Sequence, residues 1–273
     1  MEQTSGLNRN TIDKYYTTEN TVQICIELIK KYINIGPNDL CIEPSAGNGS
    51  FIKNITKLFS NYKFYDISPE NNEIIKQDYL SFDHNEISTE YNNIHIIGNP
   101  PFGRQSSLAK KFIKKSAIFS NSISFILPKS FKKDSLKKTF PLNYHLICEQ
   151  DLPDNSFTIN NNNYNVPCVF QIWIKKDVNR ILPKKLFPNK FKFVKKDENP
   201  DICFRRVGVY AGKIDKKYND KSVQSHYFIK FDIKLTDDIF EKLTQLKYKD
   251  GDNTVGPKSI SKQELIKEFN KIC

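Results

Sequence analysis

The sequence predicts an α/β protein whose larger unit is a Rossmann-like domain with a mostly parallel sheet. Two observations predict the sheet. A strand, a glycine-rich bend and a helix follow one another at residues 39–59, and the acidic residues Asp66 and Asp78 lie at the ends of the next two apolar runs. Later in the chain the composition becomes rich in proline and lysine. We therefore expect a domain at residues 1–176 and a smaller α+β unit at residues 177–273.

The composition is that of a globular protein with a polyanionic partner. The chain has 273 residues, a net charge of +11 and a pI near 9.2. Such a basic balance favours binding to nucleic acid, and lysines on an ordinary solvated surface are the alternative interpretation. The abundance of Asn, Lys and Ile is typical of an AT-rich genome, viral genomes included.

Three absences narrow the class of function. No apolar run is long enough to span a bilayer, and the polar N-terminus lacks the apolar core of a signal peptide, so no membrane partner is expected. The six cysteines stand far apart, without the CxxC or Cys/His spacing of a zinc site, so no metal is expected. Reduced thiols of this kind indicate an intracellular protein, in the cytoplasm or the nucleus.

The first helix is predicted at residues 19–32, where apolar residues recur at helical spacing. These residues are Val22, Cys25, Ile26, Ile29 and Ile33. Thr17 or Thr18 is the natural N-cap of this helix. Because the first turn of a helix has free N–H groups and a favourable dipole, this helix start is suited to a carboxylate.

A glycine-rich segment, EPSAGNG at residues 43–49, follows the first predicted strand at residues 39–42 and precedes a helix at residues 50–59. Its two glycines permit close approach of the backbone, and its small serine and alanine leave room for a ligand. The spacing is not GxGxxG, so no dinucleotide is implied. The acidic Glu43 would repel a pyrophosphate but suits a ligand that carries an ammonium or sulfonium group.

Acidic residues follow the next two strands. Asp66 ends the second predicted strand and is placed to accept both hydroxyls of a ribose. Asp78 lies in the third, at residues 74–80, and could accept from an adenine amino group while Tyr79 or Leu80 covers the ring. Either aspartate alone could equally be a turn or cap residue. Together they follow the rule that ligands bind at the carboxyl edge of a parallel sheet.

The apolar run that begins at residue 94 ends at Asn99-Pro100-Pro101-Phe102. Consecutive prolines fix φ twice and donate no hydrogen bond, so the strand ends and the Pro100 carbonyl is held in one direction. Together with the amide oxygen of Asn99, that carbonyl could accept both hydrogens of an exocyclic amine, and Phe102 offers a face to a flat base. The alternative interpretation is an ordinary strand-ending turn.

The rest of the first domain is predicted to alternate helix and strand. A helix at residues 108–118 and a strand at residues 123–127 come first, and two late strands follow at residues 144–148 and 166–174. The polar segment between the late strands is expected to be a loop that approaches the substrate at residues 154–157.

The C-terminal unit has fewer signals. Strands are predicted at residues 202–210 and 227–233, and a helix at residues 236–246. Ser261 and Glu264 form a capping box that opens a last helix.

In type, spacing and order, these motifs resemble those of S-adenosylmethionine-dependent amino-methyltransferases. The most similar arrangement is that of adenine-N6 DNA methyltransferases in which the cofactor-carboxylate motif precedes the glycine-rich one. The resemblance covers roughly residues 13–175, with Thr18 in place of the family's proline. It implies a class I methyltransferase fold with a mostly parallel seven-stranded sheet, and S-adenosylmethionine as the cofactor.

The resemblance also implies a role for each motif. Thr17 would meet the methionine carboxylate, the glycine-rich segment would surround the methionine part, Asp66 would hold the ribose, and Asp78 with Tyr79 would hold the adenine. The cofactor-binding set implied in this way is Tyr16, Thr17, Glu43, Pro44, Ser45, Ala46, Gly47, Asn48, Gly49, Asp66, Ile67, Asp78, Tyr79 and Asn99. The target amine would be held by Asn99, Pro100, Pro101 and Phe102.

The expected activity is methyl transfer to the N6 amine of adenine in nucleic acid. DNA is the first choice because of the motif order, the basic chain and the appended unit, which is a candidate target-recognition domain. The alternatives are an adenine-N6 or guanine-N2 methyltransferase acting on RNA, a protein-glutamine methyltransferase, and an inactive nucleic-acid-binding subunit. No cysteine follows the two prolines, which disfavours methylation of cytosine carbon 5. The sequence predicts no oligomeric state.

Overall fold

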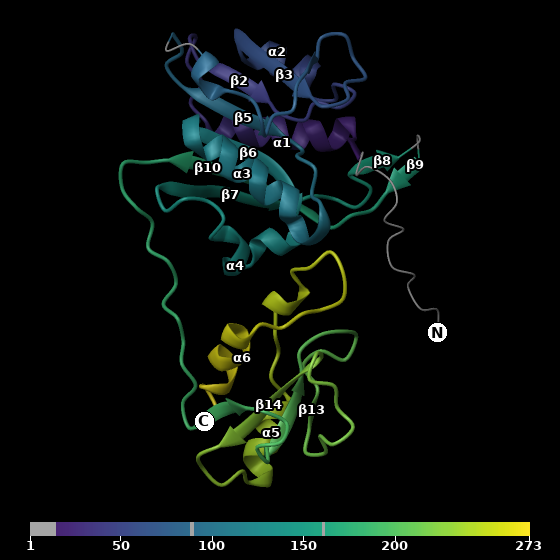
Figure 1. Cartoon of the computed structure of the whole chain (residues 1–273), viewed down its shortest axis with the longest axis vertical. Helices are drawn as coiled ribbons and strands as arrows, with labels where there is room; N and C mark the ends of the chain where they lie inside the picture. Colours follow the sequence, from purple (N-terminus) through teal and green to yellow (C-terminus); the bar gives the residue numbers. More distant parts are fainter. Residues whose placement is uncertain (1–14, 88–89, 160–161) are drawn as a thin grey trace. The chain divides into compact units, whose positions relative to one another are not determined.

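The computed structural model describes residues 15–87, 90–159 and 162–273. The chain forms two compact units, Met1–Ile181 and Leu182–Cys273 (Figure 1). The division predicted after residue 176 lies between the last strand of the first unit, which ends at Lys175, and this boundary. Each unit has a hydrophobic core of its own.

A seven-stranded sheet forms the centre of the first unit, with the strand order β4-β3-β2-β5-β6-β10-β7. The parallel strands at its centre and one edge are β2 (Leu40–Glu43), β3 (Asn61–Asp66), β4 (Ile75–Lys76), β5 (Ile94–Gly98) and β6 (Ser122–Pro128). β10 (Cys168–Lys175) runs antiparallel to both β6 and β7 (Tyr144–Asp151). This strand order is the Rossmann-like class I methyltransferase fold that was predicted, so the fold class is confirmed.

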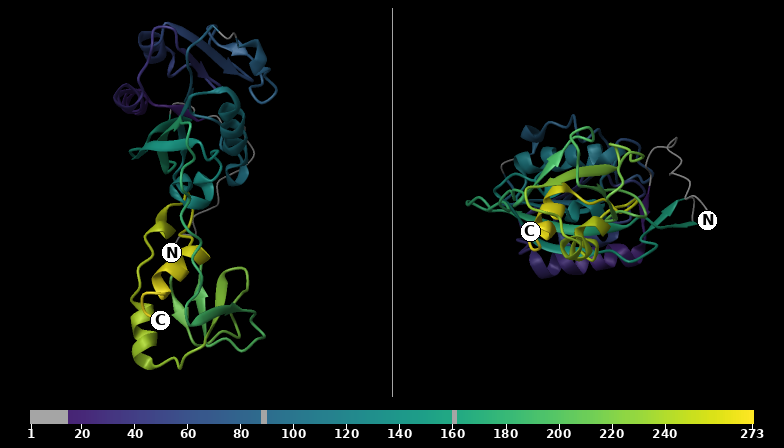
Figure 2. Two further views of the ribbon diagram at one scale, coloured as in Figure 1. Left: turned by 90° about the vertical axis from the view of Figure 1, so that its left-hand side faces the viewer. Right: turned by 90° about the horizontal axis from the view of Figure 1, so that it is seen from below.

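Helices cover both faces of the sheet. α1 (Glu19–Tyr32) has the predicted bounds and buries Val22, Cys25, Ile26 and Ile29, the stripe that a 3.6-residue period places on one side. α1 packs against β7 and β10, whereas α3 (Ser107–Phe119) packs against β6 on the opposite face (Figure 2). The other helices among the described residues of this unit are α2 (Ile52–Leu58), α4 (Asp134–Lys137) and the 3-10 helices η1 (His84–Glu86), η2 (Arg104–Ser106) and η3 (Lys129–Lys132).

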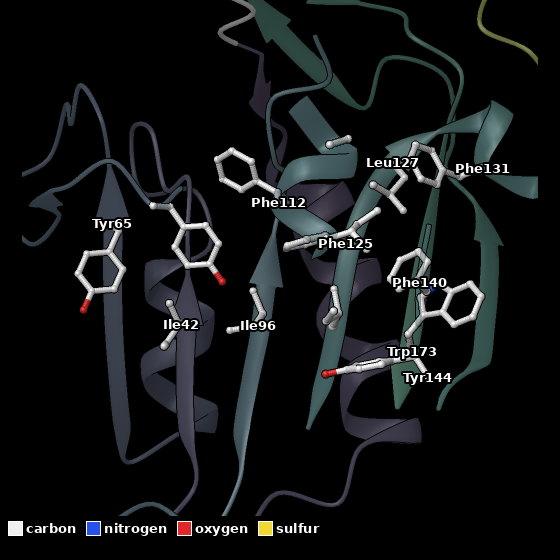
Figure 3. Packing of buried hydrophobic residues seen from close by; sticks show 14 of the residues in the cluster. Ile42, Tyr65, Ile96, Phe112, Phe125, Leu127, Phe131, Phe140, Tyr144 and Trp173 are labelled. Carbon is white, nitrogen blue, oxygen red and sulfur yellow. The ribbon is translucent and has the colours of Figure 1, made fainter. Parts of the chain in front are cut away.

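One hydrophobic core of the first unit lies between the sheet and α3. Figure 3 shows side chains of neighbouring strands, among them Ile42, Ile96 and Phe125, in one continuous layer. At its far side the ring of Trp173 stacks on Phe140, with centroids 4.1 Å apart and planes 12° apart. The β-branched and aromatic residues of the strands thus fill a buried, two-sided sheet.

A three-stranded sheet was not predicted. Its order is β1-β8-β9, with β1 at Tyr16–Thr17, β8 at Phe157–Ile159 and β9 at Asn162–Tyr164. The polar segment expected to be a loop therefore contains a hairpin. β1 pairs with β8 in the antiparallel sense, Tyr16 opposite Thr158, which ties the start of the described chain to the segment between β7 and β10.

The C-terminal unit is an antiparallel sheet with helices. The sheet has the order β11-β14-β12-β13, with β11 at Phe191–Val194, β12 at Ile202–Arg205, β13 at Ile214–Asp215 and β14 at His226–Phe231. α5 (Asp237–Thr244), η4 (Asp250–Asp252) and α6 (Lys262–Phe269) follow. The core contains Phe191, Phe204, Phe231, Leu243 and Phe269.

Several predicted elements differ in extent from the observed ones. The strand predicted at residues 202–210 ends at Arg205, because the chain turns back at Gly208 with φ +102°. The third strand, predicted at residues 74–80, is reduced to Ile75–Lys76. At the predicted capping box, Ser261 Oγ accepts from the Glu264 N–H at 3.2 Å, and Glu264 Oε1 accepts from the Gly251 N–H at 2.9 Å. In the described ranges, no helix has both the length and the apolar character that crossing a membrane requires.

Candidate active site

The predicted motifs meet at the carboxyl edge of the parallel strands. The glycine-rich bend follows β2, Asp66 is the last residue of β3, and Asn99 follows β5. Since β3, β2 and β5 are adjacent and parallel, their carboxyl ends lie side by side (Figure 1). The structure thus brings together the predicted residues of three separate sequence motifs.

The glycine-rich bend after β2 is hydrogen-bonded to β3 on one side and to the residue after β5 on the other. The Gly47 N–H donates to Asp66 Oδ2 at 2.8 Å, and the Ala46 N–H donates to the Tyr65 carbonyl at 2.9 Å. On the other side, Ser45 Oγ donates to the Asn99 carbonyl at 3.2 Å. Gly47 has a φ of +57°, a backbone conformation that residues other than glycine rarely adopt. These bonds hold the bend open at the sheet edge.

Asp66 and its neighbour lie within reach of a ligand at this edge. Asp66 is half-buried, and its second oxygen, Oδ1, accepts from the Ser68 N–H at 2.8 Å. A carboxylate has further acceptor positions besides the two that these bonds occupy. Ile67, the next residue, is 65% exposed. Asp66, the predicted ribose contact, and Ile67, a member of the predicted cofactor-binding set, are therefore accessible.

The adenine-binding prediction needs a correction at Tyr79. Its ring is 1% exposed and stacks on Phe112 at 5.4 Å between centroids, and its hydroxyl shares a hydrogen bond with Ser116 Oγ at 2.9 Å. A ring fixed in the core in this way cannot cover a base, so the prediction for the Tyr79 side chain is wrong. Asp78 is exposed and forms a local turn, with Oδ1 accepting from the Leu80 N–H at 3.0 Å.

Glu43 is a buried acid at the end of β2. It is 2% exposed, and its Oε2 has no hydrogen-bond partner among the described residues. Burial, and secondarily the charge of Asp66, raises the pKa of Glu43 to about 8. Gly98 of β5 makes this packing possible, because a Cβ at residue 98 would lie 3.2 Å from the Glu43 Cγ. A cationic ligand next to this carboxyl would favour its ionised form.

The side-chain amide of Asn99 is hydrogen-bonded to residues at the start of the described chain, at and just before β1. Its Nδ2 donates to Thr17 Oγ1 at 3.3 Å and lies 3.5 Å from the Tyr15 carbonyl. Its Oδ1 is buried and has no partner among the described residues. Pro100 is buried, and Pro101 and Phe102 are half-buried. The amide is thus fixed with a free acceptor, the group that the predicted amine-binding role requires.

Aromatic rings lie beside Asn99. Tyr15 stacks on Phe102 with centroids 6.4 Å apart and on Tyr164 of β9 at 5.3 Å, and the buried Phe157 meets it edge-on at 6.3 Å. Phe157 belongs to the segment predicted to approach the substrate, and it is buried against Tyr15. Tyr15 and Tyr164 were missed by the sequence interpretation. The pair Tyr15-Tyr16 next to Thr17 was the available signal for one of them, and no local pattern marked Tyr164.

The N-terminal motif lies against the glycine-rich bend. The Tyr16 ring is 3.7 Å from where a Cβ of residue 47 would be, and its hydroxyl donates to Glu70 Oε1 at 2.6 Å. Burial and this carboxylate raise the pKa of Tyr16 to about 12. Thr18 is the N-cap residue of α1 but makes no side-chain cap, since its hydroxyl donates to Thr21 Oγ1 at 3.0 Å. The first turn of α1 therefore has N–H groups available for an anion.

The six cysteines are free thiols, and all except Cys273 are buried. Over the residues placed by the structure, no three side chains of His, Cys, Asp or Glu come together as a metal-binding group.

Comparison with known proteins gives a family-level match to part of the chain. Residues 52–181 match the family model described as the EDM2 methyltransferase-like domain. This match begins just after the glycine-rich bend and ends at the last residue of the first unit. Among curated proteins, no sequence matches the chain.

Solved structures with similar folds include three methyltransferase-type proteins. A proposed RNA methyltransferase from Pyrococcus horikoshii has 13% identity and a TM-score of 0.47, over 63% of this chain and 92% of that one. A proposed class I S-adenosylmethionine-dependent methyltransferase from Listeria monocytogenes has 15% identity and a TM-score of 0.47, over 65% and 66%. The methyltransferase subunit of a type I restriction-modification system from Streptococcus thermophilus has 13% identity and a TM-score of 0.44, over 62% and 46%.

Proposed function

We propose that this chain transfers a methyl group from S-adenosylmethionine to the exocyclic N6 amine of adenine in nucleic acid, with DNA as the first candidate substrate. The observation that supports this most is the buried, unpartnered Oδ1 of Asn99 next to Phe102. Leaving a buried acceptor without a donor costs about 1–3 kcal/mol. A hydrogen of the substrate amine would satisfy it, and the carbonyl of Pro100 would accept the second hydrogen.

The two acceptors have a chemical purpose. When both hydrogens of the amine are engaged, its lone pair turns out of conjugation with the ring and becomes nucleophilic. S-adenosylmethionine, when bound, supplies a methyl group on a sulfonium. The lone pair would form the new N–C bond as the S–C bond breaks and its electron pair stays on sulfur, and the proton that the nitrogen loses would go to solvent. Asn99 and Pro100 position the amine for this step.

The cofactor would lie along the same sheet edge. The half-buried Asp66 would bind the ribose hydroxyls, and Glu43 would place a carboxylate near the cationic part of the methionine. The uncapped first turn of α1, with Thr17, would receive the methionine carboxylate. Asp78, and Leu80 in place of Tyr79, remain the proposed contacts of the cofactor's adenine.

The target base would stack on the aromatic rings beside Asn99. Phe102 is half-buried, and Tyr15 and Tyr164 extend its stack. A base inside a duplex cannot reach such a pocket, so the substrate base would be flipped out or already single-stranded. RNA is the second candidate substrate because the same acceptors would serve an adenine or guanine amine in RNA.

Incubation with labelled S-adenosylmethionine and separate pools of DNA, RNA and protein tests the proposal. Label should enter DNA at N6-methyladenine. Transfer to the protein pool alone would contradict a nucleic-acid substrate, and binding of nucleic acid without cofactor binding would indicate an inactive subunit.

A pair of variants tests the amine-binding assignment. Asn99→Ala should lower the rate of transfer by about a hundredfold or more, because it removes an acceptor that acts on the reacting group. Its affinity for S-adenosylmethionine should change little. Asn92→Ala, in an exposed position before β5, is the matched control and should keep full activity. Near-normal transfer by Asn99→Ala would refute the assignment.

A further inference from the structure

The C-terminal unit contains a groove of about 850 Å³. One wall is formed by the sheet, where β11 contributes Phe193 and β14 contributes Tyr227. Basic residues from three separate segments line the rest: Lys195 after β11, Arg206 after β12, and Lys262 at the start of α6. A pocket of this size accommodates more than a single phosphate.

Positive charge dominates the groove and the unit around it. The described lining residues include Lys195, Lys196, Arg206 and Lys262, with Asp197 as the opposing acid. Residues 182–273 contain 21 Lys and Arg against 13 Asp and Glu, a net charge of +8 out of the +11 of the whole chain. A third of the sequence therefore carries most of the positive charge, and its field attracts polyanions.

The charged groups are positioned by aromatic rings and carbonyls. The Arg206 guanidinium lies 5.6 Å from the Tyr227 ring centroid and donates from Nε and Nη2 to the Gln224 carbonyl, at 3.1 and 2.7 Å. The Lys262 ammonium lies 4.4 Å from the Phe193 centroid and 5.6 Å from that of Tyr227. Such contacts orient a cation without neutralising it.

These cations are not paired with acids in the part of the chain that the structure describes. The ion pairs of the unit engage other lysines, such as Lys192 with Asp232 and Lys216 with Asp237. Arg206 retains further guanidinium donors, and donors of this kind form strong, directional bonds with phosphate oxygens. The groove thus holds oriented, uncompensated cations around a space open to solvent.

We propose that this groove binds the phosphate backbone of a nucleic acid strand, and that it is where the C-terminal unit holds the substrate. This inference rests on the proposed nucleic-acid methyltransferase function and adds the surface that supplies affinity. Arg206 and Lys262 each contact a phosphate, and Lys195 extends the basic track along the groove. The phosphate contacts set the position of the strand and carry no base sequence information.

Fluorescence anisotropy of a labelled oligonucleotide, measured over a range of salt concentrations with the full-length chain, tests the groove. Affinity should fall by about 0.9 log units per log unit of salt for each B-DNA phosphate neutralised. Arg206→Gln and Lys262→Gln should each weaken oligonucleotide binding at low salt. Each should also make the salt slope shallower by about 0.9, the contribution of one B-DNA phosphate. Lys267→Gln removes an equal charge from the exposed part of the same helix, outside the groove, and should leave affinity and slope unchanged.

Distinct outcomes separate the inference from the function on which it rests. Arg206→Gln and Lys262→Gln should bind S-adenosylmethionine with unchanged affinity. Failure of the wild type to bind S-adenosylmethionine would refute the methyltransferase function without contradicting the proposed role of the groove. Equal losses of oligonucleotide affinity in Lys267→Gln and Lys262→Gln would refute that role. Competition by polyglutamate as effective as competition by unlabelled oligonucleotide would also refute it.

Discussion

The carboxylate of Asp66 holds two backbone segments of the candidate site in place. Its two oxygens accept from the N–H groups of Gly47 and Ser68, both at 2.8 Å. A substitution at residue 66 therefore removes a proposed ribose contact and also loosens the glycine-rich bend. The two effects act in the same direction on cofactor affinity.

Asp66→Ala should weaken S-adenosylmethionine binding by about ten- to a hundredfold, since hydrogen bonds to a charged acceptor contribute roughly 1.5–3 kcal/mol. Titration calorimetry measures this change. Asp83→Ala is a matched control, because Asp83 makes a similar local bond to the Asn85 N–H but lies at the start of η1, away from the bend. Equal affinities for Asp66→Ala and the wild type would exclude the ribose role.

Glu43 makes the stability of the first unit depend on pH. Its pKa is raised from 4.5 to about 8 in the folded chain, so between these values the folded state binds a proton that the unfolded state has lost. The contribution of Glu43 to the unfolding free energy is therefore complete below about pH 4.5 and is lost as the pH rises through about 8. The loss is on the order of a few kcal/mol.

Urea unfolding at a series of pH values measures this loss. The wild type should become less stable from about pH 5 to about pH 8, and Glu43→Gln should show a flatter profile over the same range, because its amide does not titrate. The difference between the two profiles isolates Glu43 from other titrating groups. Parallel profiles would show that Glu43 is ionised in the folded chain at neutral pH.

At the scale of elements, α1 and the short strands near the site show what the sequence can and cannot predict. α1 was predicted with its observed bounds because fourteen residues of helical periodicity give a strong local signal. β1 and β8 contain two and three residues, and they form through a pairing between distant parts of the chain. No periodicity is measurable over so few residues.

The same division between local signals and contacts from distant parts of the chain applies to the residues of the candidate site. The positions of Asp66 and Asn99 at one sheet edge were predictable, because the carboxyl ends of neighbouring parallel strands lie together. The position of Tyr79 next to Asp78 was also predicted, but the direction of its ring depends on packing against Phe112, which the local sequence does not contain. The hydrogen bond from Asn99 to Thr17 likewise depends on the unpredicted β1–β8 pairing.

The pairing of β1 with β8 leads to a prediction for Thr18. Its N–H donates to the Ser156 carbonyl at 3.0 Å, and its φ of −68° is one that proline adopts. Thr18→Pro should fold normally while losing this bond. Hydrogen exchange should then become faster at residues 157–159, whereas Thr18→Ala, which keeps the N–H, should leave it unchanged. Unchanged exchange in both variants would show that the bond does not hold β8.

At the scale of the whole molecule, the contacts of Arg180 extend the first unit beyond its last strand. Its guanidinium donates to the carbonyls of Phe140 at 2.8 Å and Tyr144 at 2.6 Å, and also to that of Pro141. It lies 5.1 Å from the Trp173 ring centroid. A residue beyond the last strand of the sheet therefore makes side-chain contacts within the first unit, which a division at residue 176 would overlook.

Two truncations test this boundary. A chain ending at Ile181 keeps Arg180, and it should remain folded and bind S-adenosylmethionine, because all proposed cofactor contacts lie upstream. A chain ending at Lys176 should melt at a lower temperature, because several partly buried carbonyls lose their donor. Thermal unfolding compares the two, and equal melting temperatures would show that Arg180 contributes nothing. The chain ending at Ile181 should also lose most of its nucleic-acid affinity.

The bond from the Asn99 amide to the Thr17 hydroxyl should couple the binding of the two ligands of the proposed reaction. One end of this bond belongs to the proposed methionine contact and the other to the proposed amine contact, so ordering either residue orders the other. By reciprocity, S-adenosylhomocysteine should raise the affinity for adenine-containing substrate by the factor by which the substrate raises affinity for S-adenosylhomocysteine. Titrating each ligand with and without the other measures this factor, and in Thr17→Val it should fall towards one.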